Sequence, residues 1–450
     1  MRKQTKNSPR PNTLDVITMG CSKNLVDSER LLRMFGDAGF EVRHNPEEPH
    51  AAQVVVNTCG FIGDAKQESI NMILECLEAK KAGKIGQLSV MGCLAERYRK
   101  ELPAELPEVD RWYGKFDWPT LLRDVTGKAA AEDRARPWER QLTTGPHFAY
   151  IKIAEGCDRF CGFCAIPLIT GRMHSRPIEE IADEVRSLVA SGTDEFNIIA
   201  QDLSSYGKDL YGHKALAELV QTLADIPGVE WLRLHYAYPA DFPYDVLPVM
   251  ARNANVCKYL DIALQHVSDN VLKNMRRHIT GDETRRLLER IRREVPGIHI
   301  RTTLMTGYPG EGDKEFDELL DFVREQRFER MGAFAYCEEE DTFAARNLRD
   351  EVPQEVKDDR LDRLMELQEK ISLELQEEKI GRTLRVVCDS EDEEFFVCRS
   401  EFDSPEVDPE ILVSKAGAPY PLRRGEFYNV TVREAYPFEL IAEIAEETNE

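Results

Sequence analysis

The first quarter of the chain alternates short apolar runs with longer amphipathic segments. The runs LDVIT, QVVVN and QLSVM are typical of buried parallel strands. Between them, NLVDSERLLRMFGDAG and DAKQESINMILECLEAKKAG carry apolar residues at helical spacing, and each ends at a glycine. Strands that alternate with helices form a parallel sheet, so residues 13–125 are predicted to be a small, flavodoxin-like α/β domain.

The same alternation returns on a larger scale after residues 126–146, which have no sustained period and are predicted to be a linker. Six further apolar runs follow, separated by amphipathic helical stretches: FAYIKIA, EFNIIA, WLRLH, YLDIAL, HIRTTLM and GAFAY. Six βα units favour a full or partial parallel barrel, whose active site lies at the carboxyl ends of the strands. We place this barrel and a charged connector helix in residues 147–375.

The pattern changes near residue 380, where short strands follow one another without helices. The runs TLRVVCDS, EEFFVCRSE, FYNVTVREA and FELIAEI predict a small all-β module over residues 376–446, similar to an oligonucleotide-binding barrel. Residues 1–12 are basic, and no apolar segment follows them, so we expect a disordered tail and not a signal peptide. No apolar run is long enough to cross a membrane, which favours a cytoplasmic protein.

The charge of the chain narrows the class of partner. The 59 Lys and Arg residues are outnumbered by 82 Asp and Glu residues, for a net charge of −23. Contacts to phosphates need a basic surface, so direct nucleic-acid recognition is not expected. Residues 380–445 alone carry seven basic and fourteen acidic residues, a net of −7. Such a module would attract a basic protein.

The strongest chemical signal is EGCDRFCGFCAIP, directly after the first predicted barrel strand. Its cysteines, Cys157, Cys161 and Cys164, have the spacing C-x3-C-x2-C. Thiolates are soft ligands that hold iron–sulfur clusters, and three of them leave the fourth iron of a cubane cluster open. The alternative, a structural zinc site, needs a fourth protein ligand that no neighbouring residue supplies.

Three further cysteines, Cys21, Cys59 and Cys93, stand where each of the three N-terminal strands ends. A single cysteine in such a place is usually an inert small hydrophobic residue. Carboxyl ends of parallel strands line one crevice, however, so the topology can bring these three together. They are predicted to hold a second cluster with one open iron. The other cysteines are expected to pack structurally: Cys76 within a helix, Cys257 just before the fourth barrel strand, Cys337 at the end of the sixth, and Cys388 and Cys398 in the β module.

The C-x3-C-x2-C segment after the first strand of a βα barrel resembles the radical S-adenosylmethionine superfamily. The resemblance implies that the open iron binds the amino and carboxylate groups of S-adenosylmethionine, and that one electron then gives a 5′-deoxyadenosyl radical. Phe163, just before the last cysteine, matches the aromatic residue that usually lies near the adenine.

The complete arrangement, with the N-terminal cysteines and a β module of the TRAM type, resembles the methylthiotransferases. The resemblance implies two 4Fe-4S clusters, of which the second handles the inserted sulfur. It also implies two S-adenosylmethionine molecules per turnover, one as methyl donor and one as radical source. An electron donor of low potential, such as flavodoxin or ferredoxin, and a source of sulfur would be needed as well.

Two branches of the family compete for this chain. GCSKNLVDSER resembles the motif G-C-P-K-N-x-V-D-S-E of the branch that modifies the β-carbon of an aspartate in the twelfth protein of the small ribosomal subunit, with Ser22 in place of proline. The branch that modifies an adenosine of transfer RNA reads closer to G-C-Q-M-N. Thr170 departs from the common R-G-x-x-x-S-R pattern. We favour the ribosomal protein as substrate; the alternative from another class is a non-catalytic iron–sulfur adaptor that docks on ribosomes.

Polar residues on or just after the predicted barrel strands are further candidates for contact with S-adenosylmethionine or substrate: Gln201, Asp202, Arg233, His235, Gln265 and Arg301. Loop capping and hydrogen bonding in the core are the alternative for each of them. No Ser/His/Asp set or carboxylate pair stands out, and chemistry carried by cofactors does not require one.

Overall fold

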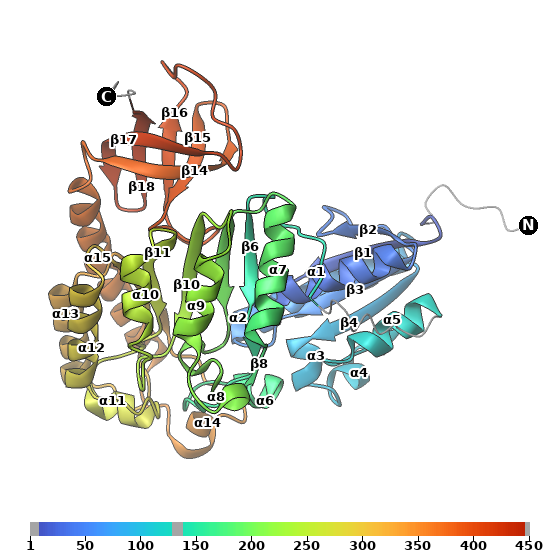
Figure 1. Cartoon of the computed structure of the whole chain (residues 1–450). Coiled ribbons are helices and arrows are strands. Elements are labelled where there is room, and N and C mark those ends of the chain that lie inside the picture. The colour runs from blue at the N-terminus through green and yellow to red at the C-terminus, as the bar shows by residue number, and fades with distance from the viewer. Residues whose placement is uncertain (1–8, 128–137, 446–450) are drawn as a thin grey trace, which may run out of the picture.

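The computed structural model of the chain describes residues 9–127 and 138–445 and contains three domains in chain order (Figure 1). The predicted tail at 1–12 and linker at 126–146 therefore lie partly outside the described residues. Within the described ranges, no helix combines the length and apolar character needed to cross a membrane.

The N-terminal domain is a five-stranded parallel sheet in the order β2-β1-β3-β4-β5. Its strands are β1 (Thr13–Thr18), β2 (Glu41–His44), β3 (Gln53–Thr58), β4 (Gln87–Gly92) and β5 (Arg111–Trp112). Its helices are α1 (Ser22–Asp37), α2 (Gly63–Lys81), α3 (Cys93–Arg97), α4 (Leu102–Glu105) and α5 (Trp118–Thr126). This is the flavodoxin-like order, and its switch point lies between β1 and β3, where ligands bind in such sheets. The predicted fold of this domain is confirmed.

The central domain is an open barrel of six parallel strands in the order β13-β12-β11-β10-β9-β6. The strands are β6 (Phe148–Lys152), β9 (Glu195–Ile199), β10 (Trp231–Ala237), β11 (Val256–Ile262), β12 (His299–Thr306) and β13 (Arg330–Ala335). All six predicted strands are present, and the barrel is a partial one. Because β11 begins at Val256, Cys257 lies inside this strand; the prediction that it precedes the strand is wrong.

Helices cover the outer face of the barrel (Figure 1). Those along the barrel are α7 (Ile178–Ala190), α9 (Leu216–Ala224), α10 (Val246–Arg252), α12 (Gly281–Glu294), α13 (Asp313–Gln326) and α15 (Gln354–Glu377). Four short helices lie at one end of it: α6 (Ile166–Thr170), α8 (Lys208–Tyr211), α11 (Asp269–Asn274) and α14 (Phe343–Asn347). The 3-10 turn η1 (Leu203–Ser205) follows β9. A short antiparallel pair, β7 (Ala154–Glu155) and β8 (His174–Ser175), flanks the cysteine loop.

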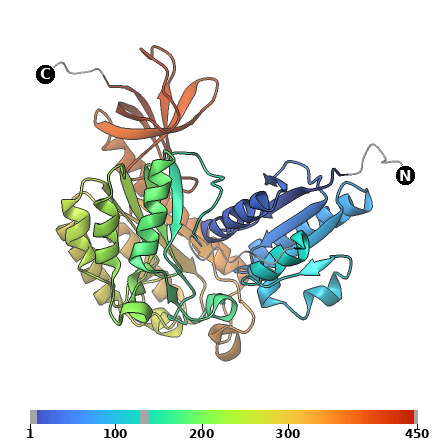
Figure 2. The same ribbon diagram turned by 45° about the vertical axis from the view of Figure 1, so that its right-hand side comes forward.

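Alternation along the barrel strands separates an apolar outer face from a polar inner face. In β10, Leu232 and Leu234 belong to the main apolar core, while Arg233 and His235 are buried polar residues. The N-terminal domain lies against the barrel at its edge strand β6 (Figure 2). At this contact Val26 of α1 packs with Phe148 and Tyr150. The concave interior of the barrel is thus polar.

The C-terminal module is a closed five-stranded barrel in the order β14-β15-β16-β18-β17. Its strands are β14 (Thr383–Glu391), β15 (Phe395–Ser400), β16 (Glu410–Ser414), β17 (Phe427–Tyr436) and β18 (Glu439–Ile444). The loop at 401–409 reaches into the central barrel, where Phe402 stacks on His299 with ring centroids 4.0 Å apart. From the same loop, Asp408 accepts a hydrogen bond of 2.7 Å from the Tyr259 hydroxyl.

A buried ionic contact fastens the β module to the barrel. Arg399 of β15 donates two hydrogen bonds, of 2.9 and 2.8 Å, to the fully buried carboxylate of Glu195. Arg233 pairs with the same carboxylate and also donates to the carbonyls of Ser400 and Glu401. Burial alone would raise the pKa of Glu195, but the charges of Arg399 and Arg233 outweigh it and hold this pKa at about 2.

Glu195→Gln should destabilise the protein by about 3 kcal/mol at pH 7, because it leaves two buried guanidinium groups without their counter-charge. The native pKa of Glu195, about 2, lies below the ordinary value of 4.5. The carboxylate therefore contributes fully above pH 4.5, and its contribution is lost as the pH falls toward 2. Urea unfolding of wild type and variant as a function of pH measures this difference. Glu289→Gln, at an exposed position of α12, is the matched control. A destabilisation that stays constant down to pH 2.5 would contradict the assignment.

Candidate active site

The three N-terminal cysteines meet because a glycine beside each of two of them allows the loops to touch. Gly20 has a φ of +88°, and a Cβ built on it would lie 2.8 Å from the sulfur of Cys59. A Cβ on Gly60 would lie 2.7 Å from the backbone of Leu94 and 2.8 Å from that of Cys93. The loop at Cys21 therefore contacts Cys59, and the loop at Cys59 contacts Cys93.

Asn24 fixes this arrangement and was not predicted from the sequence. Its side-chain amide donates hydrogen bonds of 3.0 Å to the carbonyls of Met19 and Thr58, which precede Cys21 and Cys59. Its carbonyl oxygen accepts from the Cys93 thiol at 3.6 Å. One buried side chain thus joins all three strand ends. The signals in the sequence are its position three residues after Cys21 and its match to the asparagine of the motif G-C-P-K-N.

The N-terminal cysteines form the first set. The second set, Cys157, Cys161 and Cys164, lies in the loop after β7, on the opposite side of the domain interface. The amide of Cys157 donates to the carbonyl of Gly171 at 3.2 Å, and that of Cys164 donates to the carbonyl of Cys161 at 3.0 Å. Arg277, also absent from the predictions, donates to the sulfur of Cys161 at 3.2 Å. Arg277 therefore places a positive charge directly beside the cysteine loop.

Burial raises the pKa values of four of the six thiols. Burial raises the pKa of the Cys93 and Cys157 thiols to about 12, and it also raises the pKa values of Cys59 and Cys164. The charge of Lys115 opposes this increase at Cys59 and Cys93. The buried thiols of Cys59, Cys93, Cys157 and Cys164 thus hold their protons at neutral pH in the apoprotein, and metal binding would have to displace them.

Neither cysteine set has the close grouping that a single metal ion needs. Across residues 9–127 and 138–445, no three His, Cys, Asp or Glu side chains are grouped closely enough to hold one ion. In a cubane cluster each cysteine binds a different iron, so the sulfur atoms stand farther apart than around one zinc ion. Two converging sets of three thiols fit this larger group better than they fit zinc.

The two sets face each other across the interface between the N-terminal domain and the barrel. Cys93 packs against Ala165, the residue after Cys164, and against Ile169, which is four residues further along the chain. Beside this contact lies a network of four charges, in which the lysines Lys115 and Lys152 are buried and the carboxylates of Asp27 and Glu155 are partly exposed. Lys115 is 3.0 Å from Asp27 and 3.6 Å from Glu155, and Lys152 is 2.9 Å from Glu155 and also pairs with Asp27.

Two of the predicted polar residues, Gln201 and Gln265, keep buried side-chain acceptors without a partner among the described residues. The side-chain amide of Gln201 donates to Glu155, two residues before Cys157, while its carbonyl oxygen is buried without a partner. The carbonyl oxygen of Gln265 is buried too, and neither oxygen has a partner among the described residues. A buried acceptor without a donor is the kind of group that a bound ligand satisfies.

The other predicted positions have protein partners. Asp202 accepts hydrogen bonds from Arg159 at 2.6 Å and from the amide of Ser204 at 2.9 Å, so it fastens the cysteine loop to β9. Phe163 packs edge-to-face on Tyr308 with ring centroids 6.2 Å apart.

Arg301 and Arg233 lie on inner strands, but their charges are already used. Arg301 contacts Asp261 and Asp408, each at 3.3 Å. The position of Arg233 in the contact with the β module gives no support to its predicted role in binding a cofactor.

Cys337 is exposed, so the expectation that it packs structurally is wrong, whereas Cys76, Cys257, Cys388 and Cys398 are buried as expected.

A cavity of about 330 Å³ opens beside the first cysteine set at the junction of the three domains. Cys21 and Ser22 line it from the N-terminal domain, His235 and Tyr236 from the barrel, and Glu406 from the β module. Burial and the charge of Arg233 lower the pKa of His235 well below its usual value, so its ring is neutral at pH 7.

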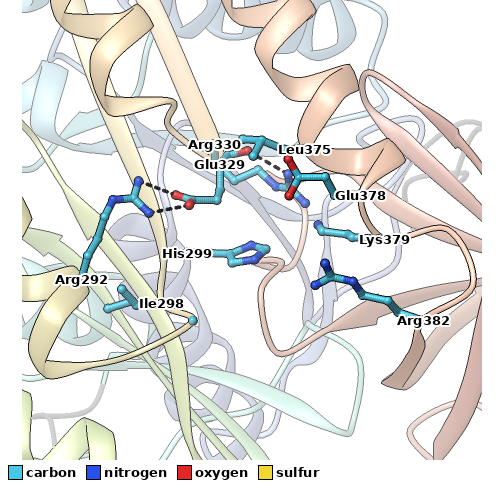
Figure 3. A pocket seen from close by; sticks show the side chains of 10 residues that line it. Arg292, Ile298, His299, Glu329, Arg330, Leu375, Glu378, Lys379 and Arg382 are labelled. Atoms are coloured by element: carbon cyan, nitrogen blue, oxygen red, sulfur yellow. Dashed lines mark hydrogen bonds and ion pairs between the residues drawn. The ribbon is translucent and has the colours of Figure 1, made fainter.

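Another cavity, of about 210 Å³, lies between β12, α12 and α15 (Figure 3). It is rich in cations, but Arg292 is held by two hydrogen bonds, of 2.6 and 3.1 Å, to Glu329. Ile298 and His299 line it at the amino end of β12. The cysteine loop follows the carboxyl end of the first strand, so this cavity belongs to the opposite end of the barrel.

Comparison with sequence families agrees with these three domains. Residues 151–323 match the radical SAM superfamily, and residues 13–114 match the uncharacterized protein family UPF0004. Residues 380–445 match the TRAM domain. The fold and the matched superfamily place the chain in the class of radical S-adenosylmethionine proteins.

Curated relatives identify the particular family. The chain is 59% identical over 435 residues to the ribosomal protein uS12 methylthiotransferase RimO of Parabacteroides distasonis, which covers 97% of this chain and 99% of that protein. It is 58% identical to the protein of the same name from Porphyromonas gingivalis, over 97% of this chain and 100% of the relative. The chain therefore belongs to the RimO family of ribosomal protein uS12 methylthiotransferases.

Solved structures support the fold alone. The radical S-adenosylmethionine methyltransferase TsrM from Kitasatospora setae, with cobalamin and a [4Fe-4S] cluster bound, has a TM-score of 0.53 at 15% identity, and the match covers 72% of each chain. The cobalamin-dependent S-adenosylmethionine radical enzyme OxsB gives a TM-score of 0.51 at 11% identity over 80% of this chain and 56% of that chain.

In the apoprotein, the exposed Cys21 and Cys337 should react with iodoacetamide at pH 7.5 at least about tenfold faster than Cys93 and Cys157. Burial restricts access to the latter two and raises their pKa values, so little thiolate is present. Mass spectrometry of the labelled peptides gives the four rates. Urea-unfolded protein is the control, in which all four should react alike. Equal rates in the folded protein would contradict the described burial.

Proposed function

We propose that the chain replaces a hydrogen on the β-carbon of an aspartate in ribosomal protein uS12 with a methylthio group. The observation that carries this proposal is an identity of 56–59% over nearly the full length to relatives named for the modification of uS12. The alternative substrate, an adenosine of transfer RNA, is not favoured by these relatives.

We assign one 4Fe-4S cluster to Cys157, Cys161 and Cys164, and a second to Cys21, Cys59 and Cys93. Two observations support this assignment. The loops that carry each set of cysteines lie close together, and the described residues contain no group of three ligands close enough to bind a single ion. When bound, the clusters and two S-adenosylmethionine molecules supply the sulfur, the methyl group and the radical.

The residues of the chain hold and shield these groups. Arg277 offers positive charge to the thiolate of Cys161. Gln201 and Gln265 offer unpaired carbonyl oxygens to a cationic amine such as that of S-adenosylmethionine. The packing of α1 on β6 limits the access of water, which would otherwise quench reactive intermediates. Asp202 acts through Arg159, which it holds beside the cysteine loop.

The substrate path that we propose follows an acidic groove of about 700 Å³ along the β module. Glu406, Asp408, Glu410 and Glu439 line it, and Glu406 also lines the cavity beside Cys21. A basic ribosomal protein would be guided along such a surface, whereas the phosphates of RNA would be repelled. We further propose a cytoplasmic enzyme that depends on a low-potential electron donor, such as flavodoxin or ferredoxin, and on an external source of sulfur.

The function is tested by incubating the reconstituted enzyme with S-adenosylmethionine, a reductant and either small ribosomal subunits or transfer RNA. Mass spectrometry should find one methylthio group in place of one hydrogen on the target aspartate of uS12. A gain on transfer RNA alone would overturn the proposed substrate, and failure to cleave S-adenosylmethionine would favour a non-catalytic adaptor.

After anaerobic reconstitution the wild type should contain about eight iron atoms per chain, because each cubane cluster holds four. The combined change of Cys157, Cys161 and Cys164 to alanine should remove about half of the iron, and the corresponding change of Cys21, Cys59 and Cys93 should remove the other half. Iron and sulfide analysis measures both. Replacing the buried Cys76 by alanine is the control, which should leave the iron content unchanged. Four irons in a fully active wild type would contradict the two-cluster assignment.

The double variant Glu410→Gln/Glu439→Gln should raise the KM for small subunits about threefold or more at low ionic strength, since two charges that guide a basic partner are lost. The difference from wild type should shrink as salt screens the charges. S-adenosylmethionine cleavage without substrate should stay unchanged. The matched control is Glu289→Gln on the outer surface of the barrel. A KM that is unchanged at every salt concentration would exclude the groove as the docking path.

A further inference from the structure

A lysine lies beside the cavity at the first cysteine set. Lys23 stands two residues after Cys21, in the first turn of α1, and its ammonium lies 3.4 Å from the centroid of the Tyr236 ring. Tyr236 lines the cavity together with Cys21 and Ser22. The cation is therefore held against the wall of the space into which the proposed substrate would reach.

Unlike Lys115, Lys152, Arg301 and Arg233, Lys23 forms no ion pair with a carboxylate of the described residues. Lys115 and Lys152 share Asp27 and Glu155, Arg301 contacts Asp261 and Asp408, and Arg233 pairs with Glu195. Among the described residues, no carboxylate oxygen lies within 4.0 Å of the Lys23 ammonium. Contact with an aromatic face still leaves N–H donors of the ammonium available to an anion.

The partner ring is placed by an unusual backbone. Tyr236 has a φ of +66°, which is costly for a bulky residue, and the register between β10 and β11 shifts between Leu234 and Ala237. Such an irregularity re-aims a side chain, and here it accompanies a ring that lines the cavity and meets the ammonium. Strain of this kind persists where the surrounding structure enforces it, and often at functional sites.

We propose that Lys23 binds the side-chain carboxylate of the substrate aspartate and so determines the specificity for an acidic residue. This inference rests on the proposed function. The reacting β-carbon is bonded directly to the carboxyl carbon, so a hold on the carboxylate positions the β-carbon as well. The other groups of the cavity wall suit this role less, because His235 is neutral and Glu406 would repel the carboxylate.

The test compares two peptides from uS12 that are identical except for aspartate or asparagine at the target position. The reconstituted wild type should favour the aspartate peptide about tenfold or more in kcat/KM, because a charge-assisted contact is lost with the amide. Lys23→Met should lose about tenfold on the aspartate peptide and change less than about twofold on the asparagine peptide. Binding of fluorescent peptides to the holoenzyme should follow the same pattern.

Two further variants separate this role from a loss of folding. Lys23→Arg keeps the positive charge and should retain most of the preference for aspartate. Lys314→Met, at an exposed position of α13, should behave as wild type. Iron content checks that each variant holds both clusters.

The peptide assay distinguishes a failure of the proposed function from a failure of the role proposed for Lys23. Wild type that modifies neither the aspartate peptide nor the intact small subunit would overturn the proposed function itself. Active wild type whose preference for aspartate is unchanged in Lys23→Met would overturn the inference alone. Equal losses on both peptides in Lys23→Met would overturn it too, since they would indicate a general structural role.

Discussion

Two buried lysines and two partly exposed carboxylates between the N-terminal domain and the barrel hold the candidate active site together. Asp27 comes from α1, Lys115 follows β5, and Lys152 and Glu155 belong to β6 and β7. Burial would raise the pKa of Asp27, but the charges of Lys115 and Lys152 hold it well below the usual range. Removing either carboxylate would weaken the compensation of the buried lysines. The relative position of the two cysteine sets thus depends on an ionic contact between domains.

The sequence was sufficient for the elements whose pattern is local. Apolar runs predicted the central strands of both sheets, and the spacing around Cys157 predicted the cysteine loop. The short edge strands β2 and β5 were missed because they carry little apolar pattern. Strand β16 of the β module was missed although it is apolar, because its run ILV spans only three residues. Asn24 and Arg277 were missed for another reason: their partners lie far away in the chain, and only the fold brings them together.

Arg233 illustrates a different limit of sequence patterns. Its place on an inner strand of the barrel was read correctly, but strand alternation reports the face of a sheet and not the neighbour that covers it. The hydrogen bonds from Arg233 to the carbonyls of Ser400 and Glu401 depend on a domain that begins about 150 residues later in the chain. The same holds for the loop at 401–409, whose insertion into the barrel has no local signal.

Helix α1 concentrates three tasks in its first two turns. Lys23 lies beside the cavity, Asn24 joins the cysteine loops, and Asp27 belongs to the ionic contact with the barrel. Each residue advances an α-helix by about 100°, so inserting or deleting one residue here would turn all three side chains away together. Evolution can therefore vary the length of this protein in its surface loops, but the register of this helix is fixed by three constraints at once.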